Sequence, residues 1–170
     1  MDKTTTKVQK MNTSTTATKM QTIMTKPIQV VSLSKKATLS TITEDIGNHP
    51  ETVMNDVANS GLEPDGPMIF VYRNCTEDMS APFDLEMTQP VKSIEGYGGK
   101  LTATTLEPVN CLERTFKGSL KNMGDKGYMP FISDLQAQGF QMTDQCREIY
   151  TQYESYESEN NIVEIQMVVA

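Results

Sequence analysis

Apolar residues recur at helical spacing in two short segments of the chain, and two strand-like segments follow each of them. Each helical segment ends at a glycine, the residue that most easily takes the left-handed conformation with which many helices end. The predicted elements are an extended segment 28–43, a helix from near Asn48 to Gly61, strands 68–73 and 83–88, an extended segment 100–120, a helix from near Pro130 to Gly139, and strands 147–152 and 162–169. The order strand, helix, strand, strand therefore occurs twice.

The two halves match with a constant offset of 78 residues. VMNDVANSG aligns without a gap on FISDLQAQG, and FDLEMTQPV aligns on NIVEIQMVV. The same offset pairs Tyr72 with Tyr150 and Glu86 with Glu164. An internal repeat of this kind predicts a pseudo-symmetric domain.

We therefore predict an α+β fold for residues 27–170, built from tandem pseudo-symmetric strand–helix–strand–strand repeats at about 27–95 and 100–170. The strands of both halves form an antiparallel sheet, and the helices lie on its outer face. The seam between the halves is the expected place for a central ligand cleft.

Strand alternation divides the side chains between the two faces of this sheet. The apolar residues expected beneath the helices are Ile69, Val71, Leu85, Met87, Ile149, Val163, Ile165, Met167 and Val169. The residues expected on the face away from the helices are Phe70, Tyr72, Glu86, Glu148, Tyr150 and Glu164. Aromatic rings mixed with carboxylates are an unusual cover for a sheet face that only meets water. We interpret the second set as ligand-binding candidates.

Composition sets the first 26 residues apart from the rest. Thr, Lys, Met and Gln dominate this segment, which cannot bury enough apolar surface to offset the entropy of ordering it. We expect a disordered basic tail, with Met20 and Met24 as alternative starts of the chain. The tail has no apolar run of the kind that a secretory signal needs, and no later segment has the apolar length to span a bilayer. A membrane partner is not expected.

Charge is also unevenly distributed. Five lysines against Asp2 give residues 1–26 a net charge of +4, and because the whole chain carries −7, residues 27–170 carry −11. So acidic a domain repels nucleic acid and attracts cationic partners. The alternative is that the charge serves solubility alone.

The sequence offers no metal site. Cys75, Cys111 and Cys146 are far apart, and His49 is the single histidine. Free thiols are typical of a reducing compartment. We expect a cytoplasmic protein without metal or cofactor.

The C-terminal stretch CREIYTQYESYESENNIVEIQMVV resembles the signature of the GyrI-like (gyrase-inhibitor-like) effector-binding domain, in which an REIY-type strand and an acidic loop precede a TEIQ-PV-type strand. FDLEMTQPV is similar to the D-x-E-x-x-x-P-V strand of that family. Phe116-Lys117-Gly118-Ser119 lies where the family usually has His-x-Gly-Pro or His-x-Gly-Ser. The similarity covers roughly residues 27–170.

The resemblance implies a small-molecule-binding domain of the kind found in bacterial multidrug-responsive AraC- and MerR-type regulators, here standing alone without a helix-turn-helix region. It implies a central pocket for cationic lipophilic compounds, with a buried glutamate that faces the ligand. By motif match this glutamate is Glu164, with Tyr150 beside it, and Glu86 and Tyr72 are their repeat mates. The chain departs from the family pattern at Phe116, at Val168 in place of a proline, and in having no tryptophan.

The leading hypothesis is the binding of cationic amphipathic small molecules, for sequestration or sensing, with charge from Glu164 and cation–π contact from the aromatic rings. One alternative is a hydrolase in which Glu164 orients water and Tyr150 assists. Another is an acidic interaction module for a basic protein partner such as a topoisomerase. For each glutamate, exposure to solvent or a salt bridge, with Arg147 or Arg114 in the case of Glu164, is the alternative to ligand contact.

Overall fold

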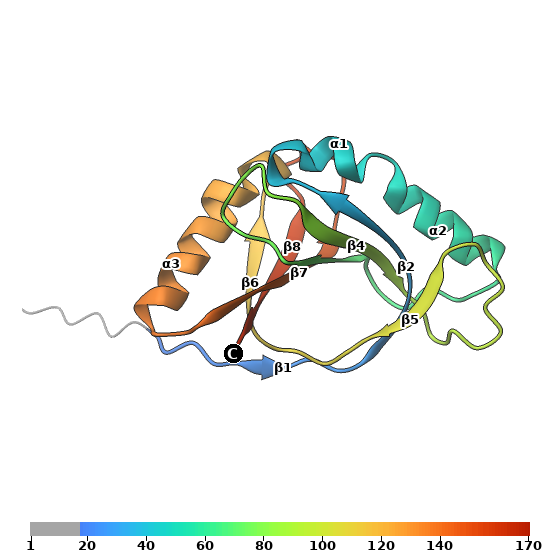
Figure 1. The fold of residues 1–170 in the computed structure, drawn as a ribbon, viewed down its shortest axis with the longest axis horizontal. Helices are drawn as coiled ribbons and strands as arrows, with labels where there is room; N and C mark the ends of the chain where they lie inside the picture. Colours follow the sequence, from blue (N-terminus) through green and yellow to red (C-terminus); the bar gives the residue numbers. More distant parts are fainter. Residues whose placement is uncertain (1–17) are drawn as a thin grey trace, which may run out of the picture.

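All the strands in residues 18–170, the part of the chain that the computed structural model describes, join one antiparallel sheet (Figure 1). The first 17 residues of the predicted tail lie outside the described residues. The strand order is β1-β6-β8-β7-β3-β4-β2-β5. The strands are β1 (Ile23–Met24), β2 (Ile28–Ala37), β3 (Ile69–Arg73), β4 (Phe83–Pro90), β5 (Thr102–Leu106), β6 (Asn110–Lys117), β7 (Met142–Gln152) and β8 (Ile162–Val169).

The sheet has the predicted two-fold repeat. Strands β2, β4 and β3 form one half, and β6, β8 and β7 form the other in mirrored order. The central strands β3 and β7 pair antiparallel, with Phe70 opposite Glu148 and Tyr72 opposite Cys146. Because the 78-residue offset also pairs Phe70 with Glu148, the pseudo-two-fold axis passes between these two residues. The α+β repeat architecture expected from the sequence is confirmed.

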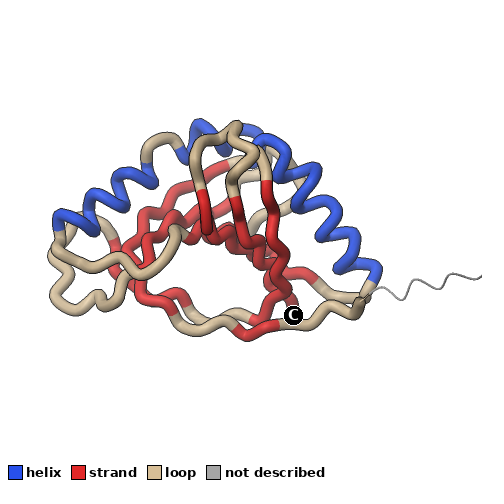
Figure 2. The backbone as a smooth tube through the Cα atoms, turned by 180° about the vertical axis from the view of Figure 1, so that it is seen from behind, coloured by secondary structure: helices blue, strands red, loops and turns tan. Residues whose placement is uncertain are grey.

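The two halves exchange their outermost strands. Strand β1 leads into β2 but pairs with β6, and β5 leads into β6 but pairs with β2. Both crossover segments run on the side of the sheet opposite the helices (Figures 1 and 2). They bond to each other where Thr25 N donates to Val109 O at 2.9 Å. Residues 18–26, expected as part of a disordered tail, are thus built into the fold.

The helices cover one face of the sheet (Figure 1). They are α1 (Ile42–Ile46), α2 (His49–Asn59) and α3 (Met129–Ala137), with short 3-10 helices at η1 (Leu39–Thr41) and η2 (Leu120–Asn122) and a π-helix at η3 (Met123–Tyr128). Gly61 and Gly139 have φ values of 70° and 81°, the left-handed conformation predicted for the helix ends. Val53 and Val57 of α2 and Phe131 and Leu135 of α3 are fully buried against the strands.

The first extended segment ends earlier than predicted. Strand β2 stops at Ala37, and η1 and α1 occupy positions that the sequence pattern assigned to a strand. The side chain of Asp45 explains the turn, because its Oδ2 accepts hydrogen bonds from Thr38 N at 3.1 Å and from Thr41 Oγ1 at 2.6 Å. Such local polar bonds compete with a sheet ladder.

The face assignment needs a correction in the two central strands. Leu85, Met87, Val163, Ile165, Met167 and Val169 pack beneath the helices as expected, but Phe70, Tyr72, Glu148 and Tyr150 lie on that same face. Ile69, Val71 and Ile149, expected beneath the helices, lie on the opposite face with Val30 and Leu106. Only Glu86 and Glu164 of the six ligand candidates face away from the helices.

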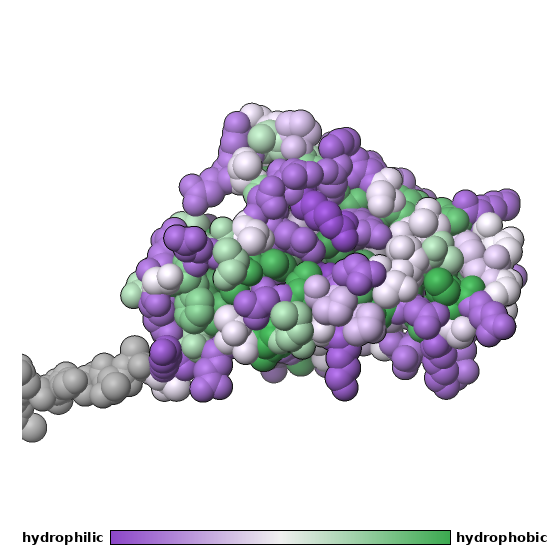
Figure 3. All heavy atoms as spheres, turned by 60° about the horizontal axis from the view of Figure 1, so that its bottom comes forward, coloured by the Kyte–Doolittle hydropathy of each residue, from purple (hydrophilic) through white to green (hydrophobic). Residues whose placement is uncertain are grey.

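The physical reason is that β3 is buried on both faces. Ile69 to Tyr72 are each 6% exposed or less, because the helices cover one face and the crossovers cover the other. When both faces are apolar, alternation no longer tells which set of side chains points to the helices. Seen from the crossover side, polar and apolar residues are mixed over the surface (Figure 3).

Arg147 occupies the crossover face of β7. It is 2% exposed, and its Nη2 donates to Glu107 O, in the crossover between β5 and β6, at 2.8 Å. Its buried Nε has no hydrogen-bond partner in residues 18–170, and burial lowers the pKa of the guanidinium. The hydrogen bond from Arg147 therefore connects a crossover to the centre of the sheet. Burial of the charged guanidinium opposes this gain, because the charge loses its hydration.

Within residues 18–170, no helix has the length and apolar character needed to cross a membrane.

Candidate functional site

A buried carboxylate at the centre of the helix-covered face accepts hydrogen bonds from three tyrosines. Glu148 is 2% exposed. Its Oε2 accepts from Tyr72 Oη at 2.9 Å and from Tyr150 Oη at 2.5 Å, and its Oε1 accepts from Tyr128 Oη at 2.6 Å. Three phenol donors on one buried carboxylate make this the most polar point of an otherwise apolar core.

Strand pairing brings these groups together. Glu148 lies opposite Phe70 of β3 on one side and opposite Ile165 of β8 on the other. Tyr72 and Tyr150 are each two residues further along their strands, so they share the face of Glu148. Tyr128 lies at the last position of the π-helix η3 and reaches Glu148 from the helix side of the sheet. Single π-helical turns often occur at functional positions.

Burial dominates the electrostatics of the site. Desolvation raises the pKa of Glu148 above its ordinary value, although the hydrogen bonds from Tyr128, Tyr150 and Tyr72 act in the opposite direction. Among the described residues, no lysine or arginine lies within ion-pair distance of Glu148. Within this part of the chain, the carboxylate is therefore stabilised by the hydroxyl dipoles of the three tyrosines and by no cationic partner.

The three tyrosines stay protonated at neutral pH. Burial, and then the charge of Glu148, raise the pKa of Tyr72 and of Tyr150 well above the ordinary phenol value. Burial also raises the pKa of Tyr128 well above that value, and the nearby Cys146 and Glu148 add to the effect. Burial likewise raises the pKa of the Cys146 thiol, which makes it a poor nucleophile.

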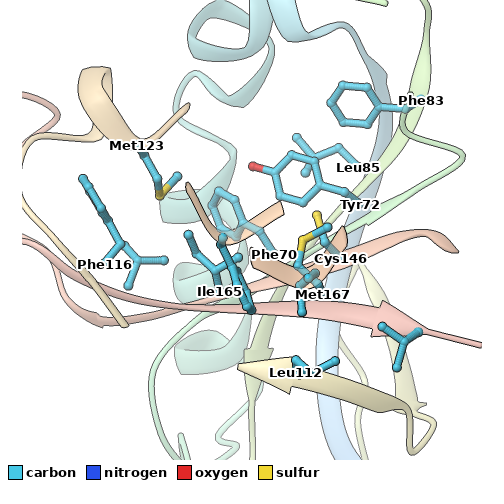
Figure 4. Close-up of a cluster of buried hydrophobic side chains, with 14 of the residues drawn as sticks. Phe70, Tyr72, Phe83, Leu85, Leu112, Phe116, Met123, Cys146, Ile165 and Met167 are labelled. Atoms are coloured by element: carbon cyan, nitrogen blue, oxygen red, sulfur yellow. The ribbon is translucent and has the colours of Figure 1, made fainter. Parts of the chain in front are cut away.

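Aromatic rings and soft side chains surround the carboxylate. The rings of Phe70 and Tyr150 lie 4.7 Å apart between centroids, and those of Tyr72 and Phe83 lie 5.4 Å apart. Figure 4 shows Phe70, Tyr72, Phe116, Cys146, Ile165 and Met167, which come from the strands, together with Met123 of η3. A negative charge within aromatic walls is the arrangement that suits an organic cation.

The structure does not bring Glu164 and Tyr150 together. In the register of β7 and β8 it is Ile149 that lies opposite Glu164, so Glu164 and Tyr150 face opposite sides of the sheet. Glu164 Oε2 accepts from Thr115 Oγ1 at 2.7 Å and is only partly buried. Its repeat mate Glu86 is in a salt bridge with Arg73 at 2.5 Å. Both glutamates lie on the crossover side.

Tyr128 was not among the residues that the sequence pattern selected. Its counterpart at the 78-residue offset is Pro50, so the repeat gave no reason to choose it. The one local signal is the sequence Lys126-Gly127-Tyr128-Met129-Pro130, in which a glycine and a proline flank an aromatic residue at the start of a predicted helix.

The expected central cleft is filled by side chains. Phe70 and Tyr72 are 5% and 6% exposed, and together with Glu148 they close the seam between the halves. A cavity of about 210 Å³ lies between β6 and η3, with Ile165 and Gly127 in its wall, and none of Phe70, Tyr72 and Glu148 lines it. A larger hollow of about 610 Å³ lies between α2 and residues 96–101, and it is lined by neither Glu148 nor its three tyrosine partners.

No protein-family model matches the sequence, and no curated protein matches it either. Solved structures do resemble the fold. The C-terminal domain of EcmrR superposes with a TM-score of 0.68 at 16% identity, over 89% of this chain and 97% of that domain. In the EcmrR–DNA complex the TM-score is 0.69 at 19% identity, and the chain spans only 57% of the EcmrR chain.

Two further structures have the same fold. SAV2435 bound to tetraphenylphosphonium superposes with a TM-score of 0.62 at 14% identity, over 89% of this chain and 94% of that one. A hydrolase from Listeria innocua superposes with a TM-score of 0.54 at 9% identity, over 89% and 92%. At these identities the likeness establishes a shared fold, one that includes the C-terminal domain of a protein seen in complex with DNA and a protein seen bound to an organic cation.

Proposed function

We propose that this protein is a GyrI-like binding domain for lipophilic organic cations and that Glu148, rather than Glu164, is the carboxylate that faces the ligand. The observation that carries the proposal is a buried carboxylate that has no cationic partner among residues 18–170 and is enclosed by aromatic rings. The SAV2435 complex supports the ligand class, because tetraphenylphosphonium is a lipophilic cation held by a protein of the same fold.

The energetics favour a cation at this position. A buried carboxylate without a counter-ion loses its hydration, and tyrosine hydroxyls restore only part of that loss. A ligand cation would supply the missing charge, and the faces of Phe70 and Tyr150 would add cation–π contact. An uncharged ligand of the same shape gains neither the attraction to the carboxylate nor the cation–π contact. Selectivity for charge is therefore the property to measure.

Ligand entry requires the core to open, since the carboxylate is covered in this structure. The covering groups include Met123 and Tyr128 of η3, a turn with the less regular π-helical bonding. Methionine adapts its side chain to varied shapes, which suits a site that accepts more than one ligand. The protein would act by sequestering its ligand or by reporting its presence to a partner.

A pair of isosteric substitutions tests the proposal. Glu148→Gln keeps the shape and removes the charge, and Glu164→Gln does the same on the opposite face of the sheet. Calorimetric titration with rhodamine 6G, a permanent cation, should give a Kd about tenfold or more higher for Glu148→Gln. Nile red, which is neutral, should bind the parent and both variants alike. Loss of rhodamine 6G binding in Glu164→Gln alone would refute the assignment to Glu148.

The hydrolase alternative now needs catalytic residues other than the pair predicted from the sequence. Glu164 and Tyr150 lie on opposite faces of the sheet, so they do not form an acid–base pair. The group with a raised pKa beside phenol donors is Glu148, and raised carboxyl pKa values are typical of general acids. Turnover of an epoxide by the parent, lost in Glu148→Gln and retained in Glu164→Gln, would support that alternative. The acidic interaction module stays a prediction.

A further inference from the structure

The tyrosine hydroxyls take up most of the hydrogen-bonding capacity of Glu148. A carboxylate offers about four acceptor positions, two on each oxygen. Oε2 of Glu148 accepts from both Tyr72 and Tyr150, and Oε1 accepts from Tyr128. Oε2 is therefore saturated, and among the described residues one acceptor position of Glu148 remains open, on Oε1. The negative charge is still available to a ligand, but most of the lone pairs are not.

The neighbours of Glu148 in the sheet add no strong acceptor. On the helix-covered face, Cys146 and Tyr150 flank Glu148 along β7. Phe70 lies opposite it on β3, and Ile165 lies opposite it on β8. These four side chains supply one hydroxyl, which already donates to Glu148, and one thiol, whose sulfur is a weak acceptor. An N–H group brought to this point therefore has the open position on Oε1 as its main partner.

Packing holds the hydroxyls on the carboxylate before any ligand arrives. Tyr72 is buried, with its ring 5.4 Å from that of Phe83. The ring of Tyr150 lies 4.7 Å from that of Phe70. The bonds from Tyr150 and Tyr128 are short, at 2.5 Å and 2.6 Å, as expected of charge-assisted hydrogen bonds. A ligand donor that displaced one of them would break one charge-assisted bond to form another, so it would gain little.

We infer that the cationic centre held against Glu148 carries at most one N–H group, so that the ligands are tertiary or quaternary onium ions rather than primary amines. The inference rests on the proposed function, since it needs a cation at Glu148. Charge attraction acts on either kind of cation, because it requires no hydrogen bond. A primary ammonium, however, brings three N–H donors that lose their water, and the open position on Oε1 serves one of them. Each donor left without a partner should weaken binding about tenfold.

Three fluorescent cations with one ring system test the inference. 1-Pyrenylmethylammonium has three N–H groups, its N,N-dimethyl derivative has one, and its N,N,N-trimethyl derivative has none. Each carries a single positive charge at neutral pH. We expect the parent protein to bind the dimethyl and trimethyl cations at least about tenfold more tightly than the primary one. Burial of the added methyl groups contributes to this preference, so the deciding quantity is its change when a tyrosine hydroxyl is removed.

Tyr128→Phe frees a second acceptor position on Oε1 and keeps the ring. The primary ammonium can use this position, whereas the dimethyl cation has no further N–H to offer. Fluorescence titration should therefore show the preference for the dimethyl over the primary cation reduced about tenfold, and methyl burial cancels from the comparison.

Two further variants complete the test. Tyr72→Phe frees a position on Oε2, and it replaces Tyr128→Phe if thermal melts show that the latter does not fold. Tyr153→Phe is the matched control, because Tyr153 is exposed and is not one of the three donors to Glu148. It should keep the preference of the parent.

The outcomes separate this inference from the cation site itself. The restriction to one N–H group is overturned by equal or tighter binding of the primary ammonium by the parent, by an unchanged preference in Tyr128→Phe, or by an equal change in Tyr153→Phe. The cation site stands in each of these cases if Glu148→Gln weakens the binding of all three cations. If none of the three binds the parent, or if Glu148→Gln binds them as the parent does, the proposed function is wrong and the restriction falls with it.

Discussion

Phe70 lies directly opposite Glu148 across the two central strands, and the 78-residue repeat makes the same two residues equivalent. The repeat therefore holds an acid in one half and an aromatic ring in the other at the pseudo-two-fold axis. Two glutamates there would place like charges about 5 Å apart in a buried site, which is strongly unfavourable. The loss of symmetry gives one charge and one ring, the two components of the proposed cation site.

Phe70→Leu should weaken cation binding selectively. Leucine keeps most of the apolar volume of phenylalanine but has no π face for the ligand. We expect the affinity for rhodamine 6G to fall by about 1 kcal/mol, roughly fivefold in Kd. Nile red titrations are the control, because the neutral dye gains no cation–π contact. An equal loss for both dyes would show that the ring serves packing alone.

The three tyrosine hydroxyls should differ in their contribution to stability. Tyr72 and Tyr150 share Oε2 of Glu148, so the loss of one leaves the other, whereas among the described residues only Tyr128 donates to Oε1. We expect Tyr128→Phe to lower the free energy of unfolding by about 2 kcal/mol and Tyr72→Phe or Tyr150→Phe by about 1 kcal/mol.

Urea unfolding at neutral pH measures these differences. Tyr153→Phe is the control. Because Tyr153 is 56% exposed, the loss of its hydroxyl should leave the free energy of unfolding unchanged. If Tyr128→Phe is the mildest of the three variants, Tyr128 does not hold Oε1 in solution.

Stability should depend on pH through Glu148. Burial raises the pKa of its carboxyl in the folded protein above the ordinary 4.5 of the unfolded chain. Below 4.5 the group is protonated in both states, and its contribution to stability is complete. As the pH rises, the unfolded chain loses this proton first, so the contribution falls until the pH has passed the folded pKa.

Glu148→Gln isolates that contribution from the other carboxyl groups, which both proteins share. The free energy of unfolding of the variant minus that of the parent should increase with pH above 4.5. Urea titrations across the pH range measure it. Parallel curves for the two proteins would mean that Glu148 has the same pKa in the folded and unfolded states.

Arg147 should be dispensable for folding. Within the described residues its buried guanidinium has no ion-pair partner and donates one hydrogen bond, to Glu107 O. Buried charges are often replaced by apolar residues with no loss of stability. We expect Arg147→Met to raise the free energy of unfolding by about 1 kcal/mol. A loss of several kcal/mol would show that the tie to the crossover outweighs desolvation.

The sequence allows the elements and the repeat to be predicted because those features are local. Glycines with left-handed φ end both predicted helices, and period-two alternation identifies β4 and β8, whose faces differ in polarity. The exchange of β1 and β5 between the halves could not be foreseen. It depends on pairing between strands distant in the chain, and both strands are short and end at a crossover.

The choice of glutamate could not be made from alternation either. Ile69 to Tyr72 are apolar or aromatic on both faces, so nothing in that strand tells whether Phe70 and Tyr72 point toward the helices. The error carried over to Glu148, which was assigned to the wrong face, and the family resemblance favoured Glu164. Pairing across β3 and β7 resolves the question, because it places Glu148 beside Phe70 and Tyr72.

Cation binding should strengthen as the pH rises through the folded pKa of Glu148. A cation prefers the ionised carboxylate, so binding lowers that pKa and releases protons when the free protein is partly protonated. Rhodamine 6G is suitable because its own charge does not change in this range. Its affinity should increase by at most about tenfold per pH unit, the limit for one linked proton, and then level off. Calorimetry in buffers with different ionisation enthalpies counts the protons released. In Glu148→Gln both the pH dependence and the proton release should disappear; if they persist, the linked group is a different residue.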